Sequence, residues 1–508
     1  MGKLTSATAF TTVETLPVVS TFINRSHKHL INGEWVKSAS GETFDVENPA
    51  TATKLTDVAK GDAEDVDRAV KAARDAFESG PWHSISARER GRLLLKLADL
   101  IEDNADELAQ IESLDNGKSV MVARWVDVAS VAEHFRYYGG WADKITGETI
   151  PVVPPYAPGA QFLNFTQREP VGVVGQIIPW NFPLVMAAWK LGAALASGCT
   201  VILKPAEQTP LSALRLGELI GEAGFPPGVV NILTGFGDIG AALASHNGVD
   251  KVAFTGSTEV GREIVKASAG NLKRVTIELG GKSPNVVFDD ADLEKAAAGA
   301  FNAIFFNHGQ NCGAGSHLFV QGQVYDELLE RLASMSAGIT LGPGMGQETE
   351  MGPLVSKEQF DRVQSYLQAG ESAGAKPLFG SNVPGGEFSS GHFVRPTIFQ
   401  DVTPEMSIVR DEIFGPVVCA TRFDDVDEIA TLANTTDYGL AAGIWTKDIQ
   451  RAHRLANAIR AGTVWINCYN MFDAASPWGG YKNSGYGREM GRQAIDNYTE
   501  VKSVWVEV

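Results

Sequence analysis

Residues 171–254 alternate between short apolar segments and longer amphipathic ones, and this alternation limits the possible fold more than any other feature of the sequence. The short segments predict buried strands, and the longer ones predict helices. Strands that alternate with helices are typical of a doubly wound parallel sheet, which binds ligands at the carboxyl ends of its strands. The predicted strands are 171–178, 200–203, 229–233 and 251–254, and the predicted helices are 184–196, 212–223 and 239–245.

A second series of the same kind follows residue 278 and predicts a second α/β domain. A chain of 508 residues is also too long for one ordinary domain. The elements expected in this series are strands at 285–288 and 318–320 and helices at 293–306 and 324–335.

The flanking segments are simpler. Residues 1–24 are expected to be loosely ordered, and Asn32-Gly33 predicts a tight hairpin turn within 30–36. Asp62 and Ser86 each precede an amphipathic run and are expected to begin helices. Residues 161–166 and 501–508 alternate with period two, so they predict exposed strands that form a small sheet. A second subunit could extend that sheet, or it could be a solvated edge ribbon.

Composition excludes several classes of protein. A net charge of −18 argues against a nucleic-acid partner, because such partners bind basic surfaces. The four cysteines lie far apart and the histidines show no metal-binding spacing, so neither a disulfide framework nor a metal site is expected and a reducing cytoplasm is the default. Polar residues interrupt the longest apolar region, 171–203, so no membrane span is expected.

Cys312 lies in a glycine-rich break, Gly-Gln-Asn-Cys-Gly-Ala-Gly, between a predicted helix and a strand. Backbone N–H groups in such a turn can favour a thiolate, which is the nucleophilic form of cysteine. Seen alone, the residue could equally be a structural cysteine in a loop.

Three other positions have the residue types of a catalytic or cofactor site. Glu278 follows an apolar strand, where partial burial raises the pKa of a carboxyl and suits it to act as a base. Asn181 lies between aromatic residues at a strand end and could donate to an oxyanion, or it could cap a helix. Lys204 and Glu207 follow another strand and could hold ribose hydroxyls, or they could be a surface pair.

Two glycine patterns compete for the phosphate-binding role. Residues 235–240 match GxGxxG, whereas residues 256–261 offer hydroxyl groups at a helix that we expect over 262–269. Composition alone does not choose between them.

Taken together, these patterns resemble the aldehyde dehydrogenase superfamily over nearly the whole chain, from Asn32 to Val504. The resemblance implies two Rossmann-type α/β domains, a small β oligomerisation element and NAD as the cofactor. Its motifs lie at 179–183, 204–210, 254–261, 278–282, 309–314, 412–416 and 476–487.

The resemblance also implies a catalytic set. Cys312 matches the nucleophile and Glu278 the general base, while Asn181 and the Cys312 backbone N–H match the oxyanion hole. Lys190 and Glu489 match a proton-relay network. The implied reaction converts an aldehyde, NAD⁺ and water into the acid and NADH through a thiohemiacetal and a thioester. No metal is implied.

By the same resemblance the phosphate loop is 256–261 and not 235–240. The implied cofactor contacts are Ile178, Trp180, Lys204, Glu207, Gly237, Gly256, Ser257, Gly261, Leu279, Glu412 and Phe414. The implied substrate tunnel comprises Phe182, Met186, Trp189, Asn302, Phe306, Met471, Phe472 and Trp478. Two residues depart from the family pattern: His317 replaces a common arginine, and Gly313 leaves out a side chain beside the nucleophile, which we expect to widen the site.

The aromatic tunnel favours an apolar, aromatic aldehyde, and several segments look most like bacterial phenylacetaldehyde dehydrogenases. A broad-specificity, aliphatic or betaine-type enzyme, a thiol esterase and a non-catalytic structural protein on this fold remain alternatives. A homo-oligomer, a tetramer or dimer, is implied. The expected domains are NAD-binding at 25–150 and 171–278, catalytic at 279–482, and oligomerisation at 151–170 and 483–508.

Overall fold

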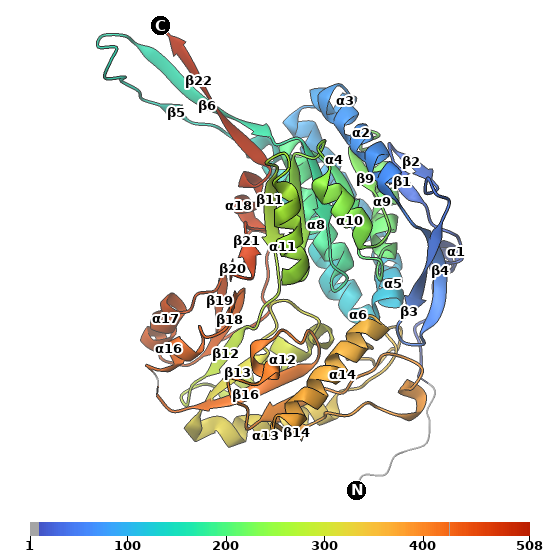
Figure 1. Cartoon of the computed structure of the whole chain (residues 1–508), viewed down its shortest axis with the longest axis vertical. Helices are drawn as coiled ribbons and strands as arrows, with labels where there is room; N and C mark the ends of the chain where they lie inside the picture. Colours follow the sequence, from blue (N-terminus) through green and yellow to red (C-terminus); the bar gives the residue numbers. More distant parts are fainter. Residues whose placement is uncertain (1–9, 426) are drawn as a thin grey trace.

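The computed structural model describes residues 10–425 and 427–508, and its core is formed by two mainly parallel sheets flanked by helices (Figure 1). The first sheet has the order β2-β1-β9-β8-β7-β10-β11-β21, in which β7 to β11 are parallel and β1 and β21 pair antiparallel near its two edges. This arrangement confirms the predicted doubly wound α/β fold. Its strands are β1 His29–Ile31, β2 Glu34–Val36, β7 Val173–Ile177, β8 Thr200–Lys204, β9 Val230–Ile232, β10 Lys251–Thr255, β11 Arg274–Glu278 and β21 Gly485–Tyr486.

Helices cover both faces of this sheet, because its central strands are apolar on both sides. Side chains such as Val173 pack with α2, α10 and α11, whereas Val174 packs with the helices of the other face. The helices of the first face are α2 Ala63–Glu78, α10 Gly237–Ser245 and α11 Thr258–Ser268. Those of the second are α4 Ala87–Asp103, α5 Ala105–Asn116, α7 Ala129–Trp141, α8 Pro183–Ser197 and α9 Leu211–Ala223.

Capping residues set several helix starts as expected. Asp62 and Ser86 each form a capping box at the start of α2 and α4. One start differs from the prediction: α11 begins at Thr258 and not at residue 262, because the Ser257 side chain accepts from Val260 N and caps the helix earlier.

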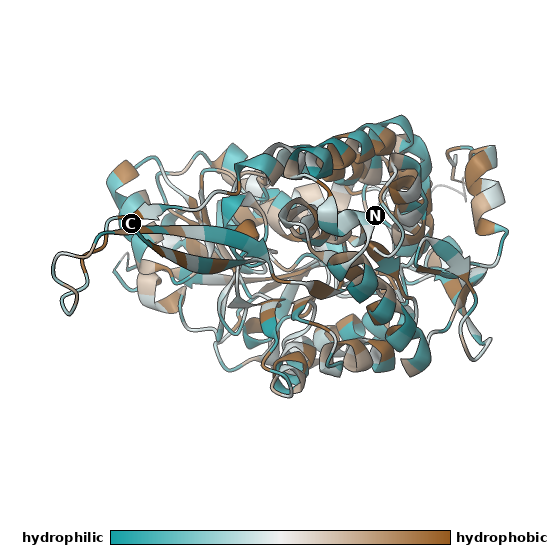
Figure 2. Ribbon diagram, turned by 90° about the horizontal axis from the view of Figure 1, so that it is seen from above, coloured by the Kyte–Doolittle hydropathy of each residue, from teal (hydrophilic) through white to brown (hydrophobic). Residues whose placement is uncertain are grey.

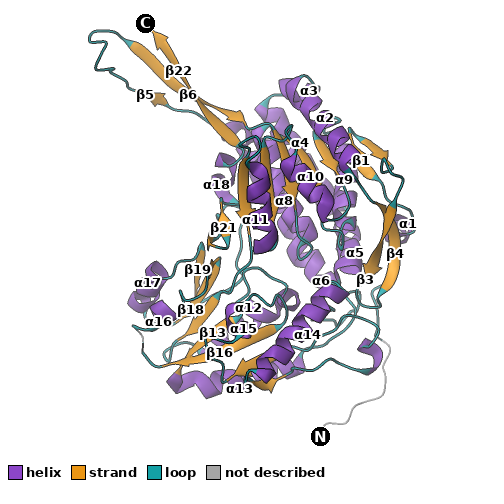
Figure 3. Ribbon diagram, viewed as in Figure 1, coloured by secondary structure: helices purple, strands orange, loops and turns teal. Residues whose placement is uncertain are grey.

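The second sheet has the order β14-β15-β16-β13-β12-β18-β19 and confirms the second α/β unit (Figure 3). Its strands are β12 Pro284–Val287, β13 His317–Gln321, β14 Lys376–Phe379, β15 Thr397–Gln400, β16 Val417–Phe423, β18 Ala441–Trp445 and β19 Thr463–Ile466. Its helices include α12 Leu293–Phe305, α13 Tyr325–Gly338, α14 Lys357–Ser372 and α17 Ile449–Ala458. Shorter elements of the chain are α3 Pro81–Ser84, α6 Val120–Val122, α15 Ser407–Arg410, α16 Ile429–Leu432, β17 Tyr438–Gly439 and β20 Tyr481–Lys482.

A ribbon of three strands projects from the body (Figures 1 and 2). In it β22 pairs antiparallel with β6 along its whole length, from Thr499 opposite Pro170 to Glu507 opposite Phe162. The predicted pairing of these two sequence-distant segments is therefore confirmed. The strands are β5 Thr149–Ile150, β6 Phe162–Pro170 and β22 Thr499–Glu507.

The structure corrects two expectations about the chain ends. Residues 483–508 are divided, since β21 joins the first sheet and α18 Gly491–Asp496 packs on α8, leaving only β22 in the ribbon. Residues 17–23, expected to be loosely ordered, form α1 Pro17–Ile23 with Val19 and Phe22 buried, because these apolar side chains gain a place in the core. Residues 1–9 lie outside the described part. A hairpin of β3 Thr43–Asn48 and β4 Thr53–Ala59 completes this end. None of the helices in the described residues is long and apolar enough to cross a membrane.

Candidate active site

The turn that carries Cys312 is held in a strained, fixed shape. Asn307 and His308 have left-handed φ values of 50° and 59°, and Gly309, with φ of 69°, lies where any side chain would clash with the backbone of Gly415. The Tyr469 hydroxyl donates to the Gly313 carbonyl at 2.9 Å. The backbone around the nucleophile candidate is therefore preorganised.

Cys312 is half-buried, and its pKa is raised to about 12, first by burial and then by the carboxyl groups of Glu412 and Glu278. These effects outweigh the backbone N–H groups of Gly313 and of Cys312 itself, which favour the thiolate. The backbone N–H groups therefore act in the expected direction, but burial outweighs them, and the thiol must lose its proton before it attacks.

Glu278 ends β11 and is buried, and neither of its carboxylate oxygens has a hydrogen-bond partner within the described residues. Burial, reinforced by the charge of Glu489, raises its pKa well above the usual range, as we expected of this position. Gly479 allows the approach, since a Cβ there would lie 2.7 Å from Glu278 Oε1. An unsolvated carboxylate of this kind is a strong proton acceptor.

Asn181 follows β7 and lies against the cysteine turn. Its Nδ2 donates to the carbonyl of Gln310 at 3.1 Å, so it does not cap α8, whose N-cap is Phe182. The backbone carbonyl of Asn181 accepts from Asn307 Nδ2 at 2.9 Å and from Lys118 Nζ at 3.1 Å. The side chain and the backbone of Asn181 are thus both held against the turn that carries Cys312.

A buried ion cluster behind Asn181 was not found by sequence reasoning. Lys118 Nζ lies 2.5 Å from Asp127 and 3.4 Å from Glu112, and all three side chains are buried. In the sequence, the only sign of this cluster is the presence of charged residues within 107–118, a stretch that the structure buries. A single sequence does not show whether such charges are buried or face solvent.

Lys190 of α8 and Glu489 form a buried ion pair with Nζ and Oε1 2.6 Å apart. Next to this pair lies Lys251, which donates to Thr276 Oγ1 at 2.9 Å and whose pKa burial lowers to about 7. The sequence indicated the first two residues only through the family resemblance and did not indicate Lys251.

The strand order of the first sheet indicates which of the two glycine patterns, 235–240 or 256–261, lies where a ligand would bind. The chain runs from β7 to β8 and β9 on one side and then returns to β10 on the other side of β7. Ligands of doubly wound sheets bind at this switch point, between the carboxyl ends of β7 and β10. Residues 256–261 follow β10 directly, whereas 235–240 follow β9, two strands from β7.

The other predicted cofactor residues lie on the same edge or on the facing loop of the second sheet. Lys204 Nζ is 3.2 Å from Glu207 Oε2 at the end of β8. Trp180 packs edge-on against Phe414 with ring centroids 5.2 Å apart. Glu412 Oε1 accepts from Gly281 N at 2.9 Å. Ile178 and Leu279 are buried, and Gly261 packs against Leu279. Gly237 is exposed.

The predicted substrate residues form two aromatic groups. Phe182 stacks on Phe306 with centroids 6.0 Å apart, and Trp189, Phe472 and Trp478 pack together at 5.0 to 6.4 Å. Met186 is buried, Met471 is 62% exposed, and Asn302 accepts from Asn470 through its backbone carbonyl. Trp465, which packs on both Phe472 and Trp478, was missed by sequence reasoning.

The two departures from the family pattern have local explanations. A Cβ at Gly313 would lie 3.0 Å from the Trp478 ring, so the indole takes the space that we expected to widen the site. His317 lies 3.2 Å from Thr421 Oγ1, and burial lowers its pKa to about 3, so it supplies no charge there.

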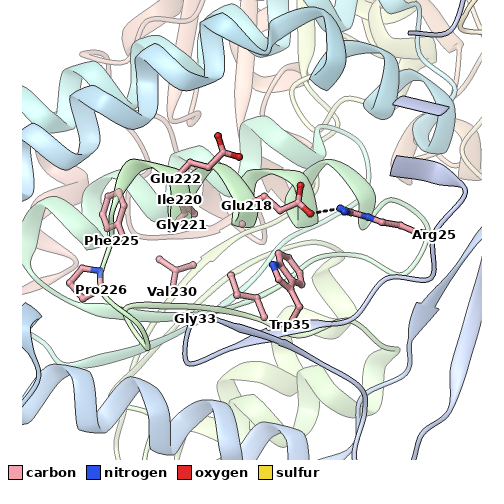
Figure 4. Close-up of a pocket in the computed structure, with 12 residues that line it drawn as sticks. Arg25, Gly33, Trp35, Glu218, Ile220, Gly221, Glu222, Phe225, Pro226 and Val230 are labelled. Carbon is pink, nitrogen blue, oxygen red and sulfur yellow. Dashed lines mark hydrogen bonds and ion pairs between the residues drawn. The ribbon is translucent and has the colours of Figure 1, made fainter. Parts of the chain in front are cut away.

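A separate surface groove of about 610 Å³ lies between the β1–β2 hairpin and α9 (Figure 4). Trp35, Phe225 and Pro226 line it, and an ion pair of Arg25 with Glu218 borders it. None of the predicted catalytic or cofactor residues lines this groove. Within the described residues no cluster of His, Cys, Asp and Glu could hold a metal ion.

A cysteine turn held against the residue that follows β7, with a buried carboxyl group near the thiol, fits a cysteine-dependent enzyme whose ligand binds at the switch point of the first sheet. Comparison with known proteins makes this specific: residues 35–504 match the model of the aldehyde dehydrogenase family, and the chain belongs to that family. It is 55% identical over 498 residues to the putative aldehyde dehydrogenase DhaS of Bacillus subtilis, covering 98% of this chain and 99% of that one. It is 52% identical to the mitochondrial aldehyde dehydrogenase of Homo sapiens, covering 94% and 91%.

Solved structures agree. The NAD⁺ complex of an aldehyde dehydrogenase from Bacillus cereus is 54% identical, with a TM-score of 0.95 over 98% of this chain and 100% of that one. The protein is an NAD-dependent aldehyde dehydrogenase.

Proposed function

We propose that this dehydrogenase oxidises an apolar aromatic aldehyde of the phenylacetaldehyde type to its acid. The observation that carries the proposal is the contact between the aromatic groups and the nucleophile turn: Trp478 packs against Gly313, directly after Cys312. Trp189 and Phe472 continue this surface. Flat apolar walls favour an aromatic ring over a cationic or short aliphatic chain.

In this proposal the thiol proton of Cys312 passes to solvent, and the sulfur bonds to the aldehyde carbon. The carbonyl π electrons move to oxygen, and the Asn181 amide and the Cys312 backbone N–H stabilise the oxyanion. Removing one such donor typically costs about 3–4 kcal/mol of barrier. When bound, NAD⁺ would supply the acceptor for the hydride that leaves the same carbon as the oxyanion re-forms the carbonyl of the thioester. Glu278 then takes a proton from water, whose oxygen attacks the thioester and releases the sulfur.

The fixed groups on the sheet edge fit a dinucleotide. The Ser257-capped start of α11, reached through Gly256, offers backbone N–H groups and a positive dipole end to a pyrophosphate. Lys204 and Glu207, which pair at the end of β8, would hold ribose hydroxyls, and Glu207 would repel a 2′-phosphate. Glu412 and Phe414 would border the nicotinamide, with Ile178, Trp180, Gly237, Gly261 and Leu279 as further contacts.

Lys190 and Glu489 are proposed to carry protons away from Glu278, since Glu489 is close enough to raise the pKa of that carboxyl. We also propose that the units at 25–150 and 171–278, at 279–482, and at 151–170 with the C-terminal strand act as NAD-binding, catalytic and oligomerisation parts. A dimer or tetramer in the cytoplasm is the proposed state.

An aldehyde panel followed by NADH absorbance tests the substrate class. Phenylacetaldehyde should give a kcat/KM at least ten-fold above those of acetaldehyde and betaine aldehyde. Equal or higher values for either small aldehyde would refute the aromatic preference. Cleavage of a nitrophenyl ester without aldehyde oxidation would instead favour a thiol esterase, and an inert protein would favour a structural role.

A further inference from the structure

His134 of α7 and Trp189 of α8 form a stacked pair at the far side of the aromatic substrate surface. Their ring centroids are 5.8 Å apart with an interplanar angle of 25°. His134 is 2% exposed and Trp189 is 7% exposed. Trp189 also contacts Phe472 and Trp478, so the pair lies one ring beyond the indole that packs next to the nucleophile.

The hydrogen-bonding state of this pair follows from its neighbours. His134 Nδ1 lies 2.6 Å from the carbonyl oxygen of Ser130, which can only accept, so Nδ1 carries the proton. Burial lowers the pKa of His134 and keeps the ring neutral, which leaves Nε2 as an acceptor. The indole Nε1 of Trp189 is a donor only.

Neither His134 Nε2 nor Trp189 Nε1 has a hydrogen-bond partner among the described residues, although both atoms are buried. Such unpaired polar atoms destabilise a fold, and phenylalanine at either position would avoid this cost. The unpaired donor, Trp189 Nε1, and the unpaired acceptor, His134 Nε2, match a hydroxyl group, which accepts from the tryptophan and donates to the histidine. A carboxylate offers no donor to the histidine, and an ammonium offers no acceptor to the tryptophan.

We propose that the physiological aldehyde carries a hydroxyl on its aromatic ring, away from the aldehyde carbon, and that His134 and Trp189 bind this hydroxyl. The inference rests on the proposed aromatic specificity and narrows it to phenolic aldehydes. Loss of one buried hydrogen bond at such a site reduces discrimination strongly, because the polar groups of the site are then left unpaired.

The test compares 4-hydroxy- and 3-hydroxyphenylacetaldehyde with 4-methylphenylacetaldehyde, which has similar size but cannot form hydrogen bonds. For the better phenol the ratio of kcat/KM over the methyl compound should be at least ten. In His134→Phe and Trp189→Phe this ratio should fall to about one, without loss of thermal stability, because each change removes an unpaired polar atom. Trp125→Phe, at an exposed tryptophan, should leave the ratio unchanged.

A wild-type ratio near one, or a ratio that survives both substitutions, would overturn the proposal. Failure of the aromatic specificity is a separate result, in which all three ring compounds react more slowly than acetaldehyde. The hydroxyl-to-methyl ratio still decides the present proposal in that case.

Discussion

Lys118 Nζ lies 3.1 Å from the backbone carbonyl oxygen of Asn181, and both residues are buried. The same ammonium pairs with Asp127 at 2.5 Å. The turn between β7 and α8, which presents the Asn181 amide to the cysteine turn, is therefore anchored by a charge that comes from the residues after α5. We infer that Lys118 is a positioning residue for the proposed oxyanion donor.

Lys118→Met should lower kcat at least ten-fold while KM for NAD⁺ changes little, because the amide loses its anchor. It should also cost about 3–5 kcal/mol of unfolding free energy, since buried Asp127 loses its partner. Steady-state kinetics and urea unfolding measure the two effects. Lys71→Met, which removes an exposed charge, should change neither. A wild-type kcat in the Lys118 variant would contradict the anchoring role.

Cys312→Ala should abolish aldehyde oxidation and leave NAD⁺ binding intact, because the sulfur forms the bond to substrate whereas the proposed pyrophosphate and ribose contacts lie at the edge of the first sheet. Calorimetric titration with NAD⁺ and an NADH assay separate these properties. Cys468→Ala is the matched control and should retain activity. Oxidation above about 1% of wild type without Cys312 would argue for another nucleophile.

Glu278→Gln should leave a rapid burst of NADH and slow the following turnover by roughly 10²–10⁴-fold, because only thioester hydrolysis then lacks its base. Stopped-flow absorbance measures both phases. Absence of a burst would mean that Glu278 is needed before hydride transfer, as the acceptor of the thiol proton.

Glu278→Gln should also raise the Tm of the protein. Because burial raises the pKa of Glu278, the folded state holds a proton that the unfolded state has lost, and stability falls as pH rises above about 4.5. Glutamine removes this penalty, so the gain in Tm should be larger at pH 8 than at pH 5. Scanning calorimetry at the two pH values checks it, and an equal or smaller gain at pH 8 would exclude a buried carboxylate.

Glu207→Gln should lower the preference for NAD⁺ over NADP⁺ at least ten-fold, since the carboxylate that repels a 2′-phosphate becomes neutral. The ratio of kcat/KM for the two cofactors measures this preference. Glu263→Gln, at an exposed acidic residue of α11 beyond the proposed phosphate loop, is a control for general loss of negative charge. Equal use of both cofactors by the wild type would refute the role.

Trp505→Asp should shift the protein to a smaller assembly, because Trp505 is 52% exposed on the outer strand of the projecting ribbon. A charge there opposes burial against another subunit. Light scattering coupled to size exclusion measures the mass. Lys502→Gln on the same strand is the control, and an unchanged mass for Trp505→Asp would place the interface elsewhere.

Much of the fold could be predicted from local sequence patterns. Alternating apolar and amphipathic runs predicted the central strands and helices of the first sheet and, in the second unit, β12, β13, α12 and α13, but they did not predict β14, β15, β16, β18 or β19. Asp62 and Ser86 marked helix starts, because capping depends on residues near in sequence. The start of α11 was misplaced because Ser257 caps it through its side chain. Cys312, Glu278 and Asn181 were found together only through a family resemblance that spans the chain.

The sequence by itself determined the fold class and the main elements of the first sheet, since these depend on residue type and local order. The candidate reacting groups came from a family resemblance that extends over nearly the whole chain. Tertiary structure alone decided that β10, the strand before the glycine loop 256–261, lies next to β7, because strand order is set by long-range pairing. It also decided that burial raises the pKa of Cys312, that Lys118 contacts the backbone carbonyl of Asn181, and that His134 stacks on Trp189. This pKa, this contact and this stacking all depend on burial and on neighbours distant in the chain, which a linear pattern does not contain.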